Sequence, residues 1–172
     1  MAELTLETVP VIRLAEARDR DGIWRILEPV IRAGETYTLP RDFSREQALG
    51  YWFSPPHEVF VAETAEGVLG TYYLRANQAG GGSHVANCGY MTADWASGRG
   101  VARAMCAHSL EWARKRGFRA MQYNFVVATN VRAVRLWESF DFRTVGRLPG
   151  AFLHPALGPV DALVLFRSLE AG

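Results

Sequence analysis

The sequence predicts a single α/β domain over residues 1–172, built on a mixed, twisted sheet with helices on both faces. The length and a hydrophobic content of 49% allow one sizeable core without disulfides or a metal. Short β-rich runs alternate along the chain with longer segments of helical periodicity. Residues 89–117 are the clearest example, because an apolar run, a glycine-rich turn and an amphipathic segment follow one another directly. These observations predict strands and helices packed in layers.

Seven β-rich runs are expected to form the sheet. They lie at residues 9–15, 59–64, 68–75, 83–92, 119–127, 142–148 and 160–169. The second and third runs are joined by a turn of the hairpin kind. Between the last two runs, residues 149–159 contain three prolines and two glycines, which predicts a stiff loop.

Four segments are expected to be helical. They lie at residues 19–31, 44–52, 101–116 and 130–140. Asp19 precedes the first helix as a candidate cap, and Pro29 is expected to kink or end that helix early. Ser44 and Gln47 have the spacing of a capping box. The third segment has a wide apolar face, which predicts packing against the sheet.

The turn before the third helix has the composition of an anion-binding site. Its small residues are Ser97, Gly98, Gly100 and Ala102. They let main-chain N–H groups approach a ligand closely, and the first helical turn adds unpaired donors and the positive end of the helix dipole. Arg99 and Arg103 add two guanidinium groups suited to phosphate oxygens. The turn therefore predicts a pyrophosphate site.

The spacing of this turn excludes the two common nucleotide motifs. A dinucleotide fingerprint requires glycine at its first, third and sixth places, but counting from Gly98 the sixth place is Arg103. A P-loop requires Gly-Lys-Ser or Gly-Lys-Thr, which the sequence lacks. The phosphate ligand is therefore expected to belong to another cofactor.

Two blocks resemble the motifs of the GNAT N-acetyltransferases. Residues 97–102 resemble the coenzyme A signature Gln/Arg-x-x-Gly-x-Gly/Ala, with Ser97 in the first place. Residues 130–142, NVRAVRLWESFDF, resemble Asn-x-x-Ala-x-x-Leu-Tyr-x-x-x-Gly-Phe, with Trp137 and Asp141 as departures. The resemblance implies the GNAT fold, with about seven strands, a splayed central pair and acetyl-CoA as the acetyl donor.

The same resemblance implies a set of cofactor-binding residues. Main-chain groups of Tyr90, Met91, Thr92 and Ala93 would bind the pantetheine. The pyrophosphate would lie on Ser97, Gly98, Arg99, Gly100, Val101, Ala102 and Arg103, with Asn130, Ala133 and Trp137 also beside the cofactor. A main-chain N–H near Met91 or Thr92 would stabilise the oxyanion. Trp137 replaces a tyrosine and is expected either to take over its role as an acid or to pack against the pantetheine.

The acceptor is expected to be a small amine that attacks the thioester directly in a ternary complex. Asn87 and Asn124 lie in predicted strands, where asparagine is depleted. They match the acceptor contacts of fungal N-acetyltransferases that acetylate proline analogues such as azetidine-2-carboxylate, which this sequence also resembles. The alternative is that both amides satisfy main-chain groups at a bulge or an edge. Glu35, Thr36 and Tyr37 are candidate acceptor contacts or a solvated loop, and Glu35 or a water chain is expected to take the proton.

The remaining features bear on partners and location. The net charge of +1 gives no field that attracts nucleic acid or an anionic membrane. Cys88 and Cys106 lack the spacing of a metal site or a redox pair, and the absence of a leader or a membrane-length apolar run favours the cytoplasm. In the GNAT fold the loop at 149–159, with Phe152 and His154, is a candidate contact with the cleft or with the second subunit of a homodimer. A non-catalytic acyl-CoA sensor stays an alternative function.

Overall fold

The computed structural model describes residues 9–170. The elements are β1 (Val11–Leu14), a 3₁₀ turn (Ala17–Asp19), α1 (Arg20–Ala33), α2 (Arg45–Trp52), β2 (Glu58–Thr64), β3 (Gly67–Ala76), a 3₁₀ turn (Gly80–Gly82), β4 (Val85–Thr92), a 3₁₀ turn (Asp94–Ala96), α3 (Val101–Lys115), β5 (Ala120–Val127), α4 (Val131–Glu138), β6 (Arg143–His154) and β7 (Gly158–Ser168). The order of strands and helices is the one that the sequence predicts.

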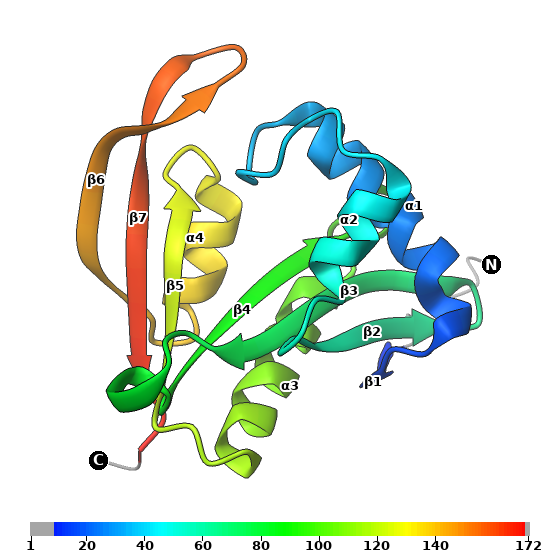
Figure 1. Ribbon diagram of the computed structural model, residues 1–172, viewed down its shortest axis with the longest axis horizontal. Coiled ribbons are helices and arrows are strands. Elements are labelled where there is room, and N and C mark those ends of the chain that lie inside the picture. The colour runs from blue at the N-terminus through cyan, green and yellow to red at the C-terminus, as the bar shows by residue number, and fades with distance from the viewer. Residues whose placement is uncertain (1–8, 171–172) are drawn as a thin grey trace, which may run out of the picture.

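The strands form one mixed, twisted sheet in the order β1-β2-β3-β4-β5-β7-β6. Neighbouring strands are antiparallel except β4 and β5, which are parallel. Figure 1 shows the two halves of the sheet, β1 to β4 on the right and β5 to β7 on the left, diverging from a common base. The expected α/β class with a mixed sheet is confirmed.

The parallel pair in the middle of the sheet separates soon after it forms. Only Val85 with Ala120 and Ala86 with Met121 are paired between β4 and β5. The pairing of β4 with β3 continues as far as Thr92. Beyond Ala86, strand β4 is therefore paired along one edge only, and the predicted splay is confirmed (Figure 1).

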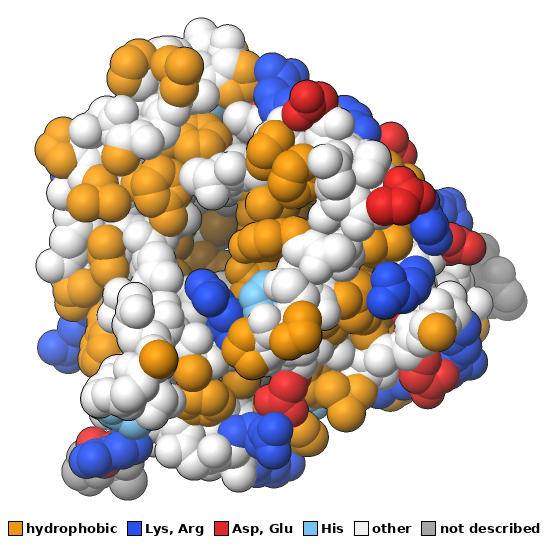
Figure 2. All heavy atoms as spheres, in the orientation of Figure 1, with side chains coloured by type: hydrophobic (Ala, Val, Ile, Leu, Met, Phe, Trp, Pro, Cys, Tyr) orange, Lys and Arg blue, Asp and Glu red, His pale blue; other side chains and the backbone are white. Residues whose placement is uncertain are grey.

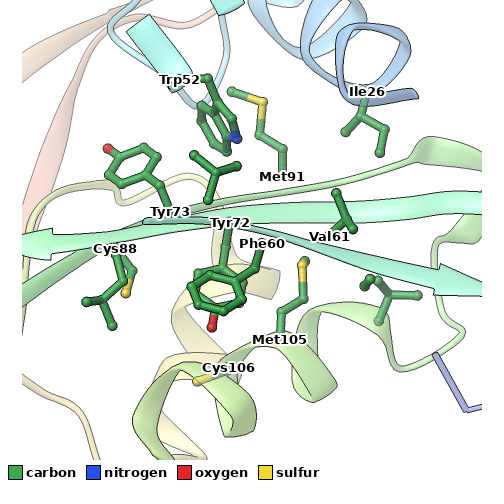
Figure 3. Close-up of a cluster of buried hydrophobic side chains, with 14 of the residues drawn as sticks. Ile26, Trp52, Phe60, Val61, Tyr72, Tyr73, Cys88, Met91, Met105 and Cys106 are labelled. Atoms are coloured by element: carbon green, nitrogen blue, oxygen red, sulfur yellow. The ribbon is translucent and has the colours of Figure 1, made fainter. Parts of the chain in front are cut away.

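Helices cover both faces of the sheet, and the core lies on each side of β2, β3 and β4. Figure 3 shows Ile26 and Trp52 packed on one side of the strands and Met105 and Cys106 on the other. On the first side, the buried indole of Trp52 donates to Thr71 Oγ1 at 3.0 Å, so its polar atom is satisfied. The helices α1 and α2 thus hold one face, and α3 holds the other.

The first helix departs from its sequence prediction at both ends. Pro29 does not end α1, which continues to Ala33, because Pro29 is exposed on a helix whose opposite side is buried in the core. Asp19 stands before the helix but makes no side-chain cap. Its carboxylate binds Arg13 at 2.7 and 2.9 Å instead. The capping box of Ser44 and Gln47 before α2 is confirmed.

The predicted loop at residues 149–159 is wrong, because β6 and β7 continue through most of it as a hairpin. Phe152 pairs with Val160 and His154 with Gly158. Two features make this compatible with the prolines: β6 is an edge strand, and a register shift between Leu148 and Phe152 takes Pro149 out of the ladder. The side chain of Phe152 is buried.

Candidate active site

The space between the splayed strands is an open cleft of about 890 Å³. Its walls come from α1 and the loop after it, from α2, from strands β3, β4 and β5, from the turn before α3 with the first residues of that helix, and from helix α4. Figure 2 shows this face hollowed between the two halves of the sheet, with hydrophobic side chains gathered around the hollow. The lining includes every residue that the sequence predicts for the site except Glu35 and Arg99.

One end of the cleft, the glycine-turn end, is formed by residues 97–103. Gly98 and Gly100 have φ of 81° and 75°, a region that favours glycine. Gly100 is also the N-terminal boundary of α3 and provides no side-chain cap. No protein atom lies within 4 Å of where a Cβ of Gly100 would stand. The first N–H groups of α3 thus open onto the cleft, which is the arrangement that favours an anion.

The arginines at this end differ from those that the sequence predicts. Arg99 does not line the cleft, since its guanidinium binds Glu66 at 2.8 and 3.1 Å. Arg103 lines it and donates to Ser139 Oγ at 3.2 Å. Arg132, from the first turn of α4, lines it too and donates to Ser97 Oγ at 2.6 Å. The second arginine at this end of the cleft is therefore Arg132, and not Arg99 as expected.

The main chain of β4 offers only alternate residues to the cleft. The N–H of Ala93 donates to a β3 carbonyl at 2.9 Å. Because bonded positions alternate along an antiparallel pair, Met91 also faces β3, whereas Tyr90 and Thr92 face the gap left by β5. The Tyr90 carbonyl accepts from the Tyr37 hydroxyl at 2.8 Å. The main-chain groups of Met91 and Ala93 are therefore used within the sheet, contrary to the sequence prediction, and those of Tyr90 and Thr92 face the cleft.

An aromatic cluster closes the cleft on the side of α3 and α4. Trp137 is 7% exposed, and its ring lies 4.9 Å from that of Tyr90 and 5.0 Å from that of Tyr123. The two tyrosine hydroxyls are 2.9 Å apart, and Tyr90 also reaches Ser109 Oγ at 2.6 Å. Burial raises the pKa of both tyrosines well above the usual range of a phenol. Trp137 thus packs against the rings of two neutral tyrosines on the cleft wall.

The opposite end of the cleft, the tyrosine end, is formed by Thr36, Tyr37, Tyr51, Tyr73, Arg75 and Asn87. A Cβ at Gly89 would lie 2.6 to 2.8 Å from atoms of the Tyr73 ring, so only glycine lets this ring cover β4. The hydroxyls of Tyr51 and Tyr73 are 3.3 Å apart. Burial raises the pKa of Tyr73, which is neutral at physiological pH.

The two predicted asparagines line the cleft, and both amides already have protein partners. Asn87 donates to the Gln122 carbonyl at 2.9 Å, which ties β4 to β5 just beyond their last ladder pair. Asn124 donates to Asn77 Oδ1 at 2.7 Å and accepts from Gln122 at 3.0 Å. These bonds fix the orientation of each amide. Each carbonyl oxygen has a second lone pair that a ligand can use.

Asn130 and Ala133 also line the cleft, where they begin α4. The side chain of Asn130 caps this helix by accepting from the Ala133 N–H at 3.4 Å. The cap holds Arg132 and Trp137 on the cleft wall because both belong to the same short helix.

The expected proton acceptor, Glu35, is exposed and does not line the cleft. His57 does not line the cleft either, but it contacts a residue that does. His57 stacks on Tyr73 with ring centroids 4.0 Å apart. Its Nδ1 lies 3.0 Å from the Trp52 carbonyl, which can only accept, so Nδ1 carries the proton and Nε2 keeps its lone pair. Burial lowers the pKa of His57, so the ring is neutral near pH 7.

Sequence reasoning missed several residues of this site. They are Tyr51, Tyr73, Arg75, Tyr123 and Arg132. Tyr51, Tyr73, Arg75 and Tyr123 stand in predicted helices or strands with no motif around them. Only Arg132 had a usable signal, since it lies within the Asn-x-x-Ala block at the start of a helix.

The described residues contain neither a cluster of metal ligands nor a membrane-spanning helix. Within residues 9–170, no three His, Cys, Asp or Glu side chains are grouped so that they could hold a metal ion. No helix in the same part of the chain has the length and apolar character needed to cross a membrane.

The cleft and the sheet around it identify the class of protein. The model of the acetyltransferase (GNAT) family matches residues 22–142, and the chain belongs to this family. It is an acyl-CoA-dependent N-acetyltransferase with acetyl-CoA as its donor.

Particular relatives agree with this class. N-acetyltransferase aca1 of Schizosaccharomyces pombe is 29% identical over 160 residues, which cover 81% of this chain and 77% of the relative. The structure of a GCN5-related N-acetyltransferase from Kribbella flavida is 41% identical and superposes with a TM-score of 0.88 over 93% of this chain and 98% of that chain. A phosphinothricin acetyltransferase from Sinorhizobium meliloti, in complex with acetyl-CoA, shares the fold at 19% identity, with a TM-score of 0.83 over 96% and 91% of the two chains.

Proposed function

We propose that this enzyme transfers the acetyl group of acetyl-CoA to the amine of a small amino acid or imino acid, by direct attack in a ternary complex. The observation that carries the proposal is the single cleft with two chemically different ends. An open helix N-terminus with arginines lies at the glycine-turn end, and hydroxyls, amides and one guanidinium lie at the tyrosine end. Two ligands bound from opposite ends would meet in the splay beside β4.

The glycine-turn end suits the pyrophosphate of coenzyme A. Arg103 and Arg132 supply two cations, and the first N–H groups of α3 supply the donors. The pantetheine would then follow β4, where the main-chain groups of Tyr90 and Thr92 face the gap. An N–H of one of these residues would stabilise the oxyanion as the amine attacks.

The tyrosine end suits a small acceptor better than a polycation. The only acidic residue among those that line the cleft in the described chain is Asp94, which lies in the turn after β4. A polycationic acceptor needs several carboxylates, whereas Asn87, Asn124 and the tyrosine hydroxyls offer neutral hydrogen bonds. These groups can orient a small molecule without attracting a large charged one.

Proton removal in this proposal uses His57 by way of water. The free Nε2 and the lowered pKa make the ring a base at neutral pH, and it stacks on a tyrosine of the cleft wall. The thiolate leaves without a strong acid, because a thiol of pKa about 8.5 is already a good leaving group near neutrality. Trp137 then contributes packing rather than a proton.

Thiol release from acetyl-CoA with a panel of amines tests the proposal. The panel holds α-, β- and γ-amino acids, imino acids, polyamines and a peptide amine. We expect turnover with one or more small amino or imino acids and none of similar efficiency with polyamines or peptides. Preference for a polyamine or a peptide would overturn the proposal that the acceptor is a small amino or imino acid. It would not affect the assignment as an acetyltransferase.

We also propose that the chain acts as one domain in a cytoplasmic homodimer. The β6–β7 hairpin exposes several apolar side chains, Val145, Leu148, Leu153 and Leu157. Exposed apolar side chains concentrated on one hairpin are compatible with a surface that a second subunit covers. The two free, buried thiols, Cys88 and Cys106, suit a reducing compartment. Light scattering of the purified chain would test the dimer, and a monomer at micromolar concentration would overturn it.

A further inference from the structure

The cations that line the cleft are divided between its two ends. Arg103 and Arg132 belong to the glycine-turn end, with Arg135 on the same side in α4. Arg75 stands apart from them on β3, opposite Asn87 in the β3–β4 register. Arg75 is therefore the cation of the tyrosine end.

Arg75 has no acidic partner among the described residues. Its one side-chain hydrogen bond runs from Nε to Asn87 Oδ1 at 3.5 Å, the limit of such a bond. Glu58, on the neighbouring strand β2, pairs with Leu74 and so projects to the other face of the sheet. There it binds Arg116 at 3.0 Å. Arg75 is thus half-buried in the cleft wall, and no carboxylate among the described residues pairs with its guanidinium.

The surroundings of Arg75 prepare it for an anion. Asn87 holds its amide by donating to the Gln122 carbonyl, so the amide oxygen stays directed at Arg75. The hydroxyls of Tyr51 and Tyr73 add two neutral groups on the same wall. A partly desolvated guanidinium gains most from a planar anion that accepts two parallel N–H bonds. A carboxylate has this geometry.

We propose that Arg75 binds the carboxylate of the acceptor and thereby selects amino acids over uncharged amines. This rests on the proposed acetyl transfer at the same cleft. Arg75 lies level with Asn87, and Tyr90 is three residues farther along β4, which is about 10 Å at roughly 3.3 Å per residue. An acceptor that reaches from Arg75 to a thioester beside Tyr90 is therefore a small molecule with its amine and carboxylate close together.

The experiment compares each acceptor with its own carboxamide. Amino and imino acids that turn over are assayed beside the matching carboxamides, with wild type, Arg75→Gln and Arg75→Lys. Arg143→Gln is the matched control, because Arg143 is an exposed arginine on β6 outside the cleft. The quantity of interest is the ratio of kcat/KM for acid over amide, in which differences in amine reactivity cancel between variants. Calorimetry with acetyl-CoA verifies that each variant retains its cofactor site.

We expect wild type to prefer the acid by roughly ten- to hundredfold, and Arg75→Gln to lose this preference through a higher KM for the acid. Arg75→Lys should recover part of it, and Arg143→Gln should keep it. Turnover with acid and amide alike in wild type, or an unchanged ratio in Arg75→Gln, would overturn the role of Arg75 and leave the proposed acetyl transfer intact. Binding of acetyl-CoA without turnover of any amine would overturn both.

Discussion

The two ends of the cleft are built in different ways. The glycine-turn end consists largely of seven consecutive residues, 97–103, and its small residues leave the main chain open to the cleft. The tyrosine end takes its groups from the loop after α1, from α2, from β3 and from β4. A site made of contiguous main chain tolerates few backbone changes, whereas a site made of distant side chains can change its specificity one residue at a time. Substitutions at each end of the cleft test this difference.

The largest expected effect is the loss of cofactor binding in Gly100→Val. Valine at a φ of 75° strains the turn, and its side chain would fill the open space above the first N–H groups of α3. We expect the Kd for acetyl-CoA to rise by about a hundredfold or more, equivalent to roughly 3 kcal/mol. Isothermal titration calorimetry measures this value.

The matched control for Gly100 is Gly117→Val at the other end of α3. Gly117 has a φ of 85°, and no atom lies within 4 Å of its Cβ position. This substitution carries similar backbone strain outside the cleft. It should lower the melting temperature without raising the Kd. Equal Kd values for Gly100→Val and wild type would contradict the prediction that the pyrophosphate binds at this turn.

The next effect concerns the tyrosine end and uses Gly89→Ala. The new Cβ would stand 2.6 Å from the Tyr73 ring and must displace it. We expect the KM for the acceptor to rise by about tenfold while the Kd for acetyl-CoA changes less than threefold, together with a stability loss of about 1–3 kcal/mol. Steady-state kinetics and calorimetry check the two values. A parallel rise of both values would mean that the ends are not independent.

A smaller effect is expected at the aromatic wall, where both ligands would meet. Trp137→Phe keeps an aromatic ring against Tyr90 and Tyr123 but removes the indole N–H. If Trp137 only packs, kcat should fall by less than about tenfold. A loss of several orders of magnitude in kcat, with the circular dichroism spectrum unchanged, would make the indole N–H part of the chemistry.

The smallest effect on activity is expected far from the cleft, at Asp19. The guanidinium of Arg13 lowers the pKa of this buried carboxyl, so the pair stabilises the fold above the unfolded pKa of about 4 and is lost as pH falls through the lower folded pKa. Asp19→Asn should cost about 2 kcal/mol at pH 7 and should weaken the acid sensitivity below pH 4. Urea unfolding of wild type and Asp19→Asn, at pH 7 and below pH 4, measures the two differences in the free energy of unfolding.

Asp21→Asn is the control for Asp19, because Asp21 is 86% exposed where it meets Arg45. An exposed ion pair contributes about 0.5 kcal/mol or less. Both variants should keep the Kd for acetyl-CoA and the KM for the acceptor. A shift of either constant in Asp19→Asn would mean that the α1 end of the sheet is coupled to the cleft.

The glycine-turn end was predictable from sequence because its physics is local. Positive φ values at Gly98 and Gly100, and the helix N-terminus after them, follow from residues that are adjacent in the chain. The error at this end was Arg99, whose direction depends on Glu66, 33 residues away. A guanidinium on a turn can point either way, and a distant carboxylate decides which.

The tyrosine end was only partly predictable. Asn87 and Asn124 were singled out because asparagine is rare in strands, but their partners Gln122 and Asn77 are set by the sheet. Arg75 carried no local signal. It stands out because the fold places no acidic side chain of the described residues beside it, and Glu58 binds Arg116 on the other face of the sheet. No rule of sequence spacing describes such an arrangement.

Periodicity, capping and turn chemistry act over a few residues, so the order of the elements, the α/β class and the position of the glycine turn were predictable without the structure. Long-range packing decided the rest. Burial of its apolar face carried α1 past Pro29, and strand pairing turned the proline-rich segment into the β6–β7 hairpin. The early separation of β4 from β5 then opened the cleft, and the pairing of β3 with β4 placed Arg75 across from Asn87 on its wall.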